Sequence, residues 1–117
     1  MLTGPPAARI FVSLAPTDLR CSFDGLSARV RRDFGADPHS GHMFVFCNRR
    51  RDMVKILCWD RTGFWVWAKR LERGTFRFVG ASAQVEIDWA ELTLVLEGIE
   101  LDSVRRRPRW RPARAAA

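Results

Sequence analysis

The sequence predicts one small α+β domain, an antiparallel β-meander of four to five strands with one helix before it and one after. Three observations predict this class. Short runs rich in Val, Ile, Phe and Trp follow one another from residue 43 to residue 79, separated by brief turns. Segments on either side of these runs carry apolar residues at helical spacing. The length of 117 residues allows one hydrophobic core but not two ordinary domains.

The chain begins with a predicted strand and a predicted helix. Arg9 to Leu14 is an apolar, β-branched run that stops just before a proline, as a strand does. Thr17 and Asp18 are good helix caps. From Phe23 to Phe34 the apolar residues lie three or four apart, and Gly35 follows where helices commonly stop. We expect an amphipathic helix there.

The centre of the chain carries the strongest β signal. Turn residues separate the apolar runs at Asn48, at residues 60–63 and at residues 72–74. Connections this short make neighbouring strands antiparallel, because a parallel return needs about a dozen residues or more. We expect the strands and helices to pack as two layers. The four predicted strands of the meander are Met43–Cys47, Met53–Trp59, Phe64–Lys69 and Thr75–Val79.

The end of the domain is predicted to be a short fifth strand, a helix and a tail. Gln84 to Ile87 is the candidate strand. Asp88 and Glu91 match a capping box ahead of an apolar run, and Gly98 marks the end of the second helix. The domain is expected to span residues 1–102, followed by an arginine-rich tail over residues 103–117 that is disordered or extended.

Positive charge is concentrated in two segments. The whole chain carries a net charge of +7. Residues 49–79 hold nine Lys or Arg against three acids, residues 80–104 hold six acids and no base, and residues 105–117 hold six Arg. This distribution suggests an anionic partner for the two basic segments.

The turn after residue 48 places three adjacent arginines on a predicted hairpin tip. Several guanidinium groups on a rigid loop suit phosphate oxygens, although a solvated turn would have the same composition. Residues 105–114 allow two interpretations: this arginine tail binds nucleic acid without sequence preference, or it folds back on the acidic residues 80–104. The candidate nucleic-acid-binding residues are Arg49, Arg50, Arg51, Lys69, Arg70, Arg73, Arg105, Arg106 and Arg107.

Aromatic and basic residues interleave over residues 59–70. Such a hairpin could stack nucleic-acid bases, or its aromatic side chains could belong to the core, because both faces of the strand are apolar. Trp65 and Trp67 are the candidate partner-binding residues.

No pattern in the sequence indicates catalysis, a cofactor or a membrane segment. His39 and His42 lie three apart, and Cys47 and Cys58 eleven apart, without the paired spacing of a zinc site. Neither a nucleophile elbow nor a phosphate loop occurs. We expect no enzyme activity, no catalytic residues, no metal and no cofactor. The short apolar runs and the odd number of cysteines predict a soluble, cytoplasmic protein.

The order of short motifs from Arg9 to Ile99 resembles one known family. The motifs begin with Thr17-Asp18-Leu19-Arg20 and Ser22-Phe23-Asp24-Gly25-Leu26, then Asp37-Pro38 with Ser40-Gly41-His42-Met43-Phe44-Val45-Phe46. They continue with Asn48-Arg49-Arg50-Arg51-Asp52, Lys55-Ile56-Leu57, Trp59-Asp60 with Gly63, Lys69-Arg70-Leu71-Glu72 with Gly74 and Phe76, and Leu96-Glu97-Gly98-Ile99. In the identity and order of these motifs, the chain resembles the TnpB accessory proteins of insertion sequence 66-type bacterial transposons.

The resemblance implies a helper of DNA transposition without strand-transfer chemistry of its own. Family members are encoded beside a small first accessory protein and a separate transposase with an Asp-Asp-Glu active site. We therefore expect DNA, mostly through its backbone, and that transposase as partners, with the small accessory protein as a further one. The alternative is a pure protein-interaction module that docks the transposase or self-associates without binding DNA.

Overall fold

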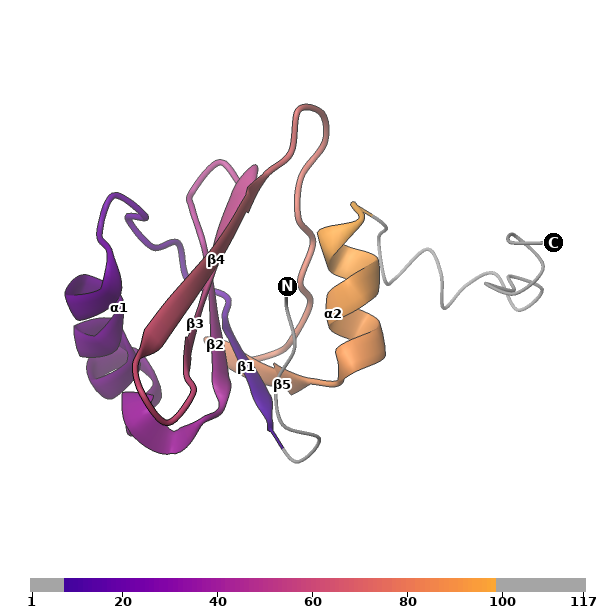
Figure 1. The fold of residues 1–117 in the computed structure, drawn as a ribbon. Helices are drawn as coiled ribbons and strands as arrows, with labels where there is room; N and C mark the ends of the chain where they lie inside the picture. Colours follow the sequence, from indigo (N-terminus) through magenta and orange to yellow (C-terminus); the bar gives the residue numbers. More distant parts are fainter. Residues whose placement is uncertain (1–7, 99–117) are drawn as a thin grey trace, which may run out of the picture.

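The structure is a computed structural model that describes residues 8–98, a five-stranded sheet with a helix on each side (Figure 1). The α+β class predicted from the sequence is confirmed. The strands are β1 (Ile10–Ser13), β2 (Met43–Cys47), β3 (Met53–Trp59), β4 (Phe64–Arg70) and β5 (Gln84–Ile87). The helices are α1 (Phe23–Arg29), which continues as the π-helical turn η1 (Val30–Phe34), the 3-10 turn η2 (Pro38–Ser40) and α2 (Trp89–Leu96).

The strand order is β4-β3-β2-β1-β5. Strands β2, β3 and β4 form the predicted antiparallel meander, with Phe44 opposite Leu57 and Ile56 opposite Trp67. Strand β1 lies parallel to β2, and β5 is antiparallel to β1. The parallel pair is possible because residues 14–42 make a long crossover that contains α1.

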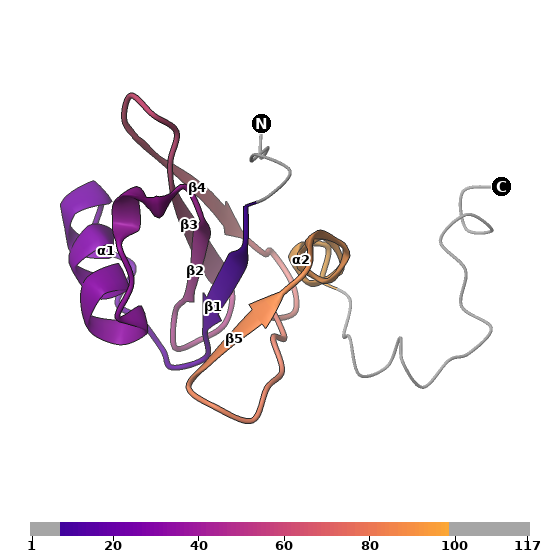
Figure 2. The ribbon, with the colours of Figure 1, turned by 90° about the horizontal axis from the view of Figure 1, so that it is seen from below.

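The sheet is covered on both faces, so the predicted two-layer packing is wrong. Helix α1 and helix α2 lie on opposite sides of the sheet (Figure 2). On the α1 side, Leu26 and Val30 pack with Phe44, Phe46 and Leu57. The α2 side buries the alternate residues of the same strands, including Val45 and Ile56, which pack with Leu92 and Val95 of α2. Because side chains alternate along a strand, a continuous apolar run such as β2 supplies buried side chains to the cores on both faces of the sheet.

The first helix lies where the apolar spacing predicts it, but its start differs. Thr17 and Asp18 do not cap it; they lie in the preceding loop, and Ser22 is the residue before the first turn. Gly35 closes the helical segment with a left-handed φ of 60°. Glycine at position 25 has a packing cause, because a Cβ there would come within 2.5 Å of the Cys21 Cβ.

The strand predicted at Thr75–Val79 does not form. This segment is an extended loop that crosses the α2 side of the sheet. Phe76 is fully buried and Phe78 is 8% exposed, and both join the core on that side. The Phe76 N–H donates to the Arg51 carbonyl (2.7 Å) instead of pairing with β4. Alternating apolar residues therefore reflect burial here, and β4 remains an edge of the sheet.

The second helix follows its predicted signals. The Asp88 side chain accepts a hydrogen bond from the Glu91 N–H (2.8 Å), which satisfies one free donor of the first turn. The helix ends at Leu96, and Gly98 adopts a φ of 82°. The predicted tail, residues 103–117, lies outside the described residues. Among the described helices, none has the length and apolar content to cross a membrane.

Candidate nucleic-acid interface

The turn between β2 and β3 is organised by the side chain of Asn48. Its Oδ1 accepts hydrogen bonds from the N–H groups of Asp52 and Met53 (3.1 Å each), and its Nδ2 donates to Asp52 Oδ1 (2.7 Å). Arg51 adopts a left-handed φ of 62°, and its N–H donates to the Asn48 carbonyl (3.1 Å). These bonds fix the backbone of the turn, so that the exposed side chains of Arg49 and Arg50 project from a defined tip.

Two neighbouring segments hold this turn in place. The Thr17 N–H donates to the Cys47 carbonyl (2.9 Å), and the Leu71 N–H donates to the Asp52 carbonyl (2.8 Å). The Arg51 guanidinium donates through Nη2 to the Leu14 carbonyl (2.9 Å) and is partly buried. The Arg51 side chain therefore mainly links the turn to the end of β1.

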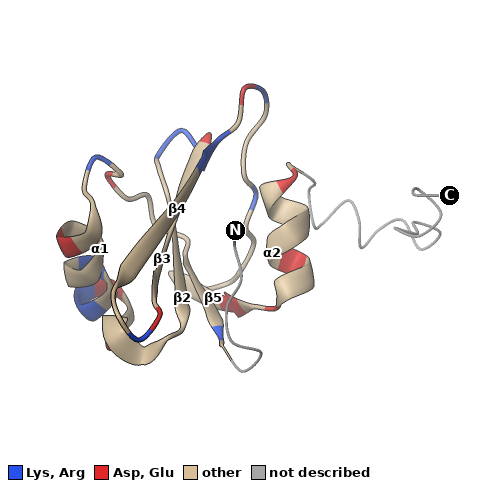
Figure 3. Ribbon diagram, viewed as in Figure 1, with Lys and Arg blue, Asp and Glu red and all other residues tan. Residues whose placement is uncertain are grey.

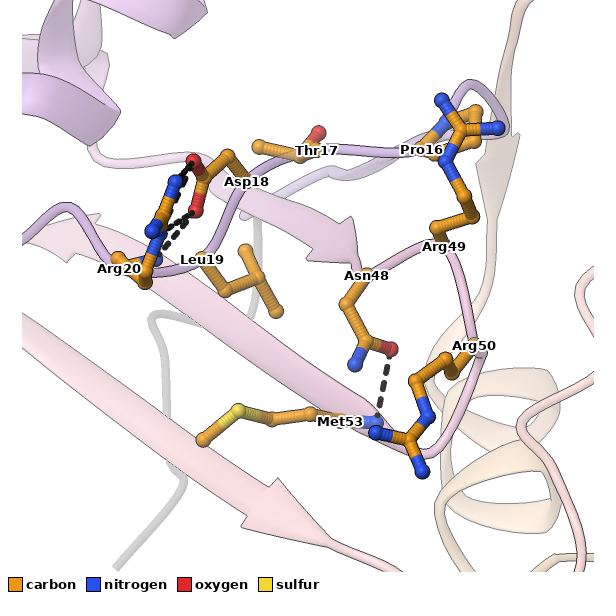
Figure 4. Close-up of a pocket in the computed structure, with 9 residues that line it drawn as sticks. All are labelled: Pro16, Thr17, Asp18, Leu19, Arg20, Asn48, Arg49, Arg50 and Met53. Atoms are coloured by element: carbon orange, nitrogen blue, oxygen red, sulfur yellow. Dashed lines mark hydrogen bonds and ion pairs between the residues drawn. The ribbon is translucent and has the colours of Figure 1, made fainter.

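The turn and residues 16–20 enclose an open cavity of about 530 Å³, which we call the arginine cradle. Leu19 and Met53 supply apolar lining. Arg20 lies on the wall formed by residues 16–20, and Arg49 and Arg50 lie on the wall formed by the turn (Figure 4). The walls come from segments about 30 residues apart in the sequence. The residues that line the cradle are Pro16, Thr17, Asp18, Leu19, Arg20, Asn48, Arg49, Arg50 and Met53.

The charge of Arg20 is already matched inside the cradle. Its guanidinium binds the Asp18 carboxylate through Nη2 (2.6 Å) and Nε (3.0 Å). Hydrogen bonds from the Arg20 side chain, and then from its backbone N–H, hold the pKa of Asp18 well below its usual range. The carboxylate thus stays ionised at neutral pH and offsets one arginine.

Arg49 and Arg50 carry the excess positive charge of the cradle. Among the residues that the structure describes, none accepts a hydrogen bond from either guanidinium. The hydrogen bond from Asn48, and secondarily the charges of Arg50 and Arg70, lower the pKa of Asp52. Three arginines against one aspartate among the lining residues leave a net charge of +2 facing the cavity. An anion with several oxygens fits this arrangement.

Further cations lie at the same end of the molecule (Figure 3). Arg70 is exposed and stands opposite Met53 in the β3–β4 register, next to the cradle. Arg73 is exposed in the loop that follows β4. Lys69 points to the other face, where its Nζ donates to the Leu96 carbonyl (2.8 Å) and neutralises the C-terminal end of α2. Arg105, Arg106 and Arg107 lie outside the described residues.

Comparison with known proteins decides the family. A family model described as "IS66 Orf2 like protein" (TnpB_IS66) matches residues 8–106. The chain belongs to this TnpB family. It is therefore similar to accessory proteins of insertion sequence 66 transposition, a family not known to be catalytic.

Two similar proteins come from Sinorhizobium fredii (strain NBRC 101917 / NGR234). "Uncharacterized protein y4hO" is 34% identical over 119 residues, which cover 97% of this chain and 98% of that protein. "Uncharacterized protein y4jC" is 34% identical over 117 residues, covering 98% and 100%. No solved structure matches the chain.

The two candidate tryptophans of this TnpB family member are partly committed to the core. Trp65 and Trp67 are half-buried and pack against the apolar cluster on the α2 side. The buried part of each of these two side chains therefore belongs to the core.

The most exposed large aromatic side chain in the described chain is that of Trp89, 45% exposed on the first turn of α2. Sequence reasoning missed it, because its neighbours Asp88 and Glu91 indicate only a helix cap.

The histidines occupy separate positions in this TnpB fold. His39 packs edge-on against Trp59, with ring centroids 4.8 Å apart, and His42 Nδ1 accepts a hydrogen bond from the Arg9 N–H (3.0 Å). Within residues 8–98, no group of three His, Cys, Asp or Glu side chains is arranged to hold a metal ion.

Arg20 and its loop are the main omission of the sequence-based site. Thr17 and Asp18 were interpreted as helix caps, and the structure instead uses Asp18 to bind Arg20. The only indication in the sequence was that residues 17–20 and residues 48–52 both belong to the set of motifs that resembles the TnpB family. Nothing in their spacing indicates that they meet.

Replacing Asn48 with alanine is expected to lower the free energy of unfolding by about 1–3 kcal/mol. The substitution leaves the Asp52 and Met53 N–H groups without their acceptor in a part-buried turn. Urea denaturation followed by tryptophan fluorescence measures the change. Thr62→Ala is the matched control in the other hairpin turn, where the exposed hydroxyl makes only a 3.3 Å bond to Asp60. If both variants lose the same stability, Asn48 has no special role.

Proposed function

We propose that the arginine cradle binds the phosphate backbone of DNA, and that the protein is a non-catalytic factor that helps the transposase engage the ends of its element. The supporting observation is the convergence of two distant segments on one open cavity with an excess charge of +2. Guanidinium groups make bidentate, charge-assisted bonds to phosphate oxygens. The cradle therefore suits a repeating polyanion better than a neutral ligand.

The geometry favours backbone contact over base reading. Arg49 and Arg50 lie on the tip of a turn. Arg70 pairs with Met53 at the end of that turn, and Arg73 follows in the loop after β4. Such contacts position a protein on DNA without carrying sequence information. Neither described helix belongs to a helix-turn-helix arrangement that would place one in the major groove. We therefore expect similar affinity for element-end DNA and for scrambled DNA.

A salt titration tests this proposal. Labelled element-end and scrambled duplexes are titrated with the full chain between 50 and 200 mM salt, and again with a chain that lacks residues 103–117. Phosphate contacts from four arginines outside the deleted tail predict a slope of log K against log salt of roughly −3 to −4, which should survive the deletion. These arginines are Arg49, Arg50, Arg70 and Arg73. Loss of all salt-dependent binding on deletion would assign the contact to the tail.

The second candidate function is a protein-interaction module that docks the transposase without touching DNA. The exposed indole of Trp89 favours it, because exposed aromatic side chains are common anchors of protein interfaces. Absence of DNA binding by the intact chain in the same titration, together with transposase binding that Trp89→Ala abolishes, would establish this function in place of the first.

A further inference from the structure

Strand β4 leaves one set of backbone groups without a partner. The N–H of Asp60 donates to the Gly63 carbonyl (3.0 Å) at one end of the β3–β4 hairpin, and the N–H of Leu71 donates to the Asp52 carbonyl at the other. Hydrogen-bonded and non-hydrogen-bonded pairs alternate along an antiparallel ladder, so the hydrogen-bonded residues of β4 are Trp65, Trp67 and Lys69. The groups of the alternate residues face away from the sheet, and no described residue bonds to them. These residues are Phe64, Val66, Ala68 and Arg70.

Over its first five residues, this edge lacks the devices that usually block strand pairing. Edge strands are commonly short, or carry proline, charge or a bulge. Strand β5, the opposite edge, has four residues and an exposed charge at Glu86. Strand β4 has seven residues, no proline, and no charge before Lys69. It also presents four consecutive half-buried apolar side chains, from Phe64 to Trp67.

The sequence of β4 is complementary to itself when two copies run antiparallel about Trp67. In this register Trp67 meets its own symmetry mate, and Val66 meets Ala68 of the second copy. Arg70 lies opposite Phe64, so that its guanidinium meets an aromatic ring. Lys69, whose Nζ is held by the Leu96 carbonyl, lies opposite Trp65, and no like charges face each other. The hydrogen-bonded pairs of the new ladder fall on the four residues whose backbone faces outward.

We propose that the protein self-associates through β4, so that two copies form one continuous ten-stranded sheet about a twofold axis. A self-complementary patch is what such a symmetric interface requires. Centring the pair on Trp67 uses the whole strand, whereas centring it on Lys69 would oppose two ammonium groups. A second copy is therefore the occupant that the register favours over a foreign strand. The inference does not depend on DNA binding.

Analytical ultracentrifugation of the full chain without DNA tests this proposal. We expect a species of twice the 13.4 kDa chain mass at tens of micromolar protein. Ala68→Pro removes an outward N–H while sparing the bonds to β3, and should raise the dissociation constant by roughly tenfold or more. Ala68→Val keeps that N–H and is the matched control. A monomeric wild-type chain, or a dimer equally stable in both variants, would overturn the proposal.

Disulfide trapping tests the register even if the proline variant fails to fold. Residues paired across the twofold axis at a non-hydrogen-bonded site have Cα atoms about 4.5 Å apart, within the range of a disulfide. In a Cys21→Ser background, Trp67→Cys should form a covalent dimer on mild oxidation, and Trp65→Cys should not. Cys47 and Cys58 are buried and do not interfere. Equal crosslinking of both variants, or of neither, would contradict this register.

Discussion

Replacing both Arg49 and Arg50 with alanine is expected to weaken DNA binding by on the order of 10- to 100-fold at physiological salt. The two guanidinium groups carry the excess charge of the cradle and donate to no described residue, so their loss should remove the proposed phosphate contacts without breaking the fold. The slope of log K against log salt should fall in magnitude by about 2. Fluorescence anisotropy with a short duplex measures both quantities.

The control for this variant removes the same charge from elsewhere. Arg61 is exposed in the β3–β4 turn at the other end of β3, and Arg31 is exposed on η1. Because Arg61 has a φ of 85°, glycine is the neutral replacement there. The double variant Arg31→Ala with Arg61→Gly should lower affinity by less than about threefold, through net charge alone. Equal losses in the two double variants would show that the cradle is not a specific phosphate site.

Replacing Phe76 with alanine is expected to cost about 3–5 kcal/mol of unfolding free energy. The side chain is fully buried against the α2 side of the sheet, although its segment has no regular secondary structure. Urea denaturation measures the loss. Phe23→Ala, which truncates a ring that is 44% exposed on α1, should cost less than about 1 kcal/mol. A small loss at Phe76 would mean that the loop is not part of the core.

Local signals predicted the helices and the central hairpins well. The apolar spacing of Leu26 and Val30, the glycine at position 35 and the cap at Asp88 each act within a few residues, and each has the predicted structural role. The meander from Met43 to Arg70 followed from short turns for the same reason.

Long-range pairing was not predictable from these signals. The alternation of Phe76 and Phe78 is the same in a strand and in an extended loop that buries both rings. The choice depends on which backbone groups are free nearby, and the Arg51 carbonyl accepts the Phe76 N–H. Likewise, nothing local to Ile10–Ser13 indicates that this strand lies parallel to β2.

The candidate site was predictable only in part. The exposed arginines of the turn, Arg49 and Arg50, were identified from composition and turn chemistry, and their phosphate contacts stay predictions. Arg51 and Lys69 have the same charge, yet their side chains donate to carbonyls of Leu14 and Leu96, distant in the sequence. Charge patterning shows where cations occur along the chain, whereas their partners depend on the tertiary fold.

The most direct test of phosphate binding in the cradle is a titration of the isotope-labelled chain with a short DNA duplex, followed by amide NMR spectra. We expect the largest shift changes at residues 17–20 and 48–53, the two segments that supply the lining of the cradle. Smaller changes should follow at Arg70 and Arg73. Changes confined to β4, α2 or the residues after 98, with the cradle amides unmoved, would contradict the account.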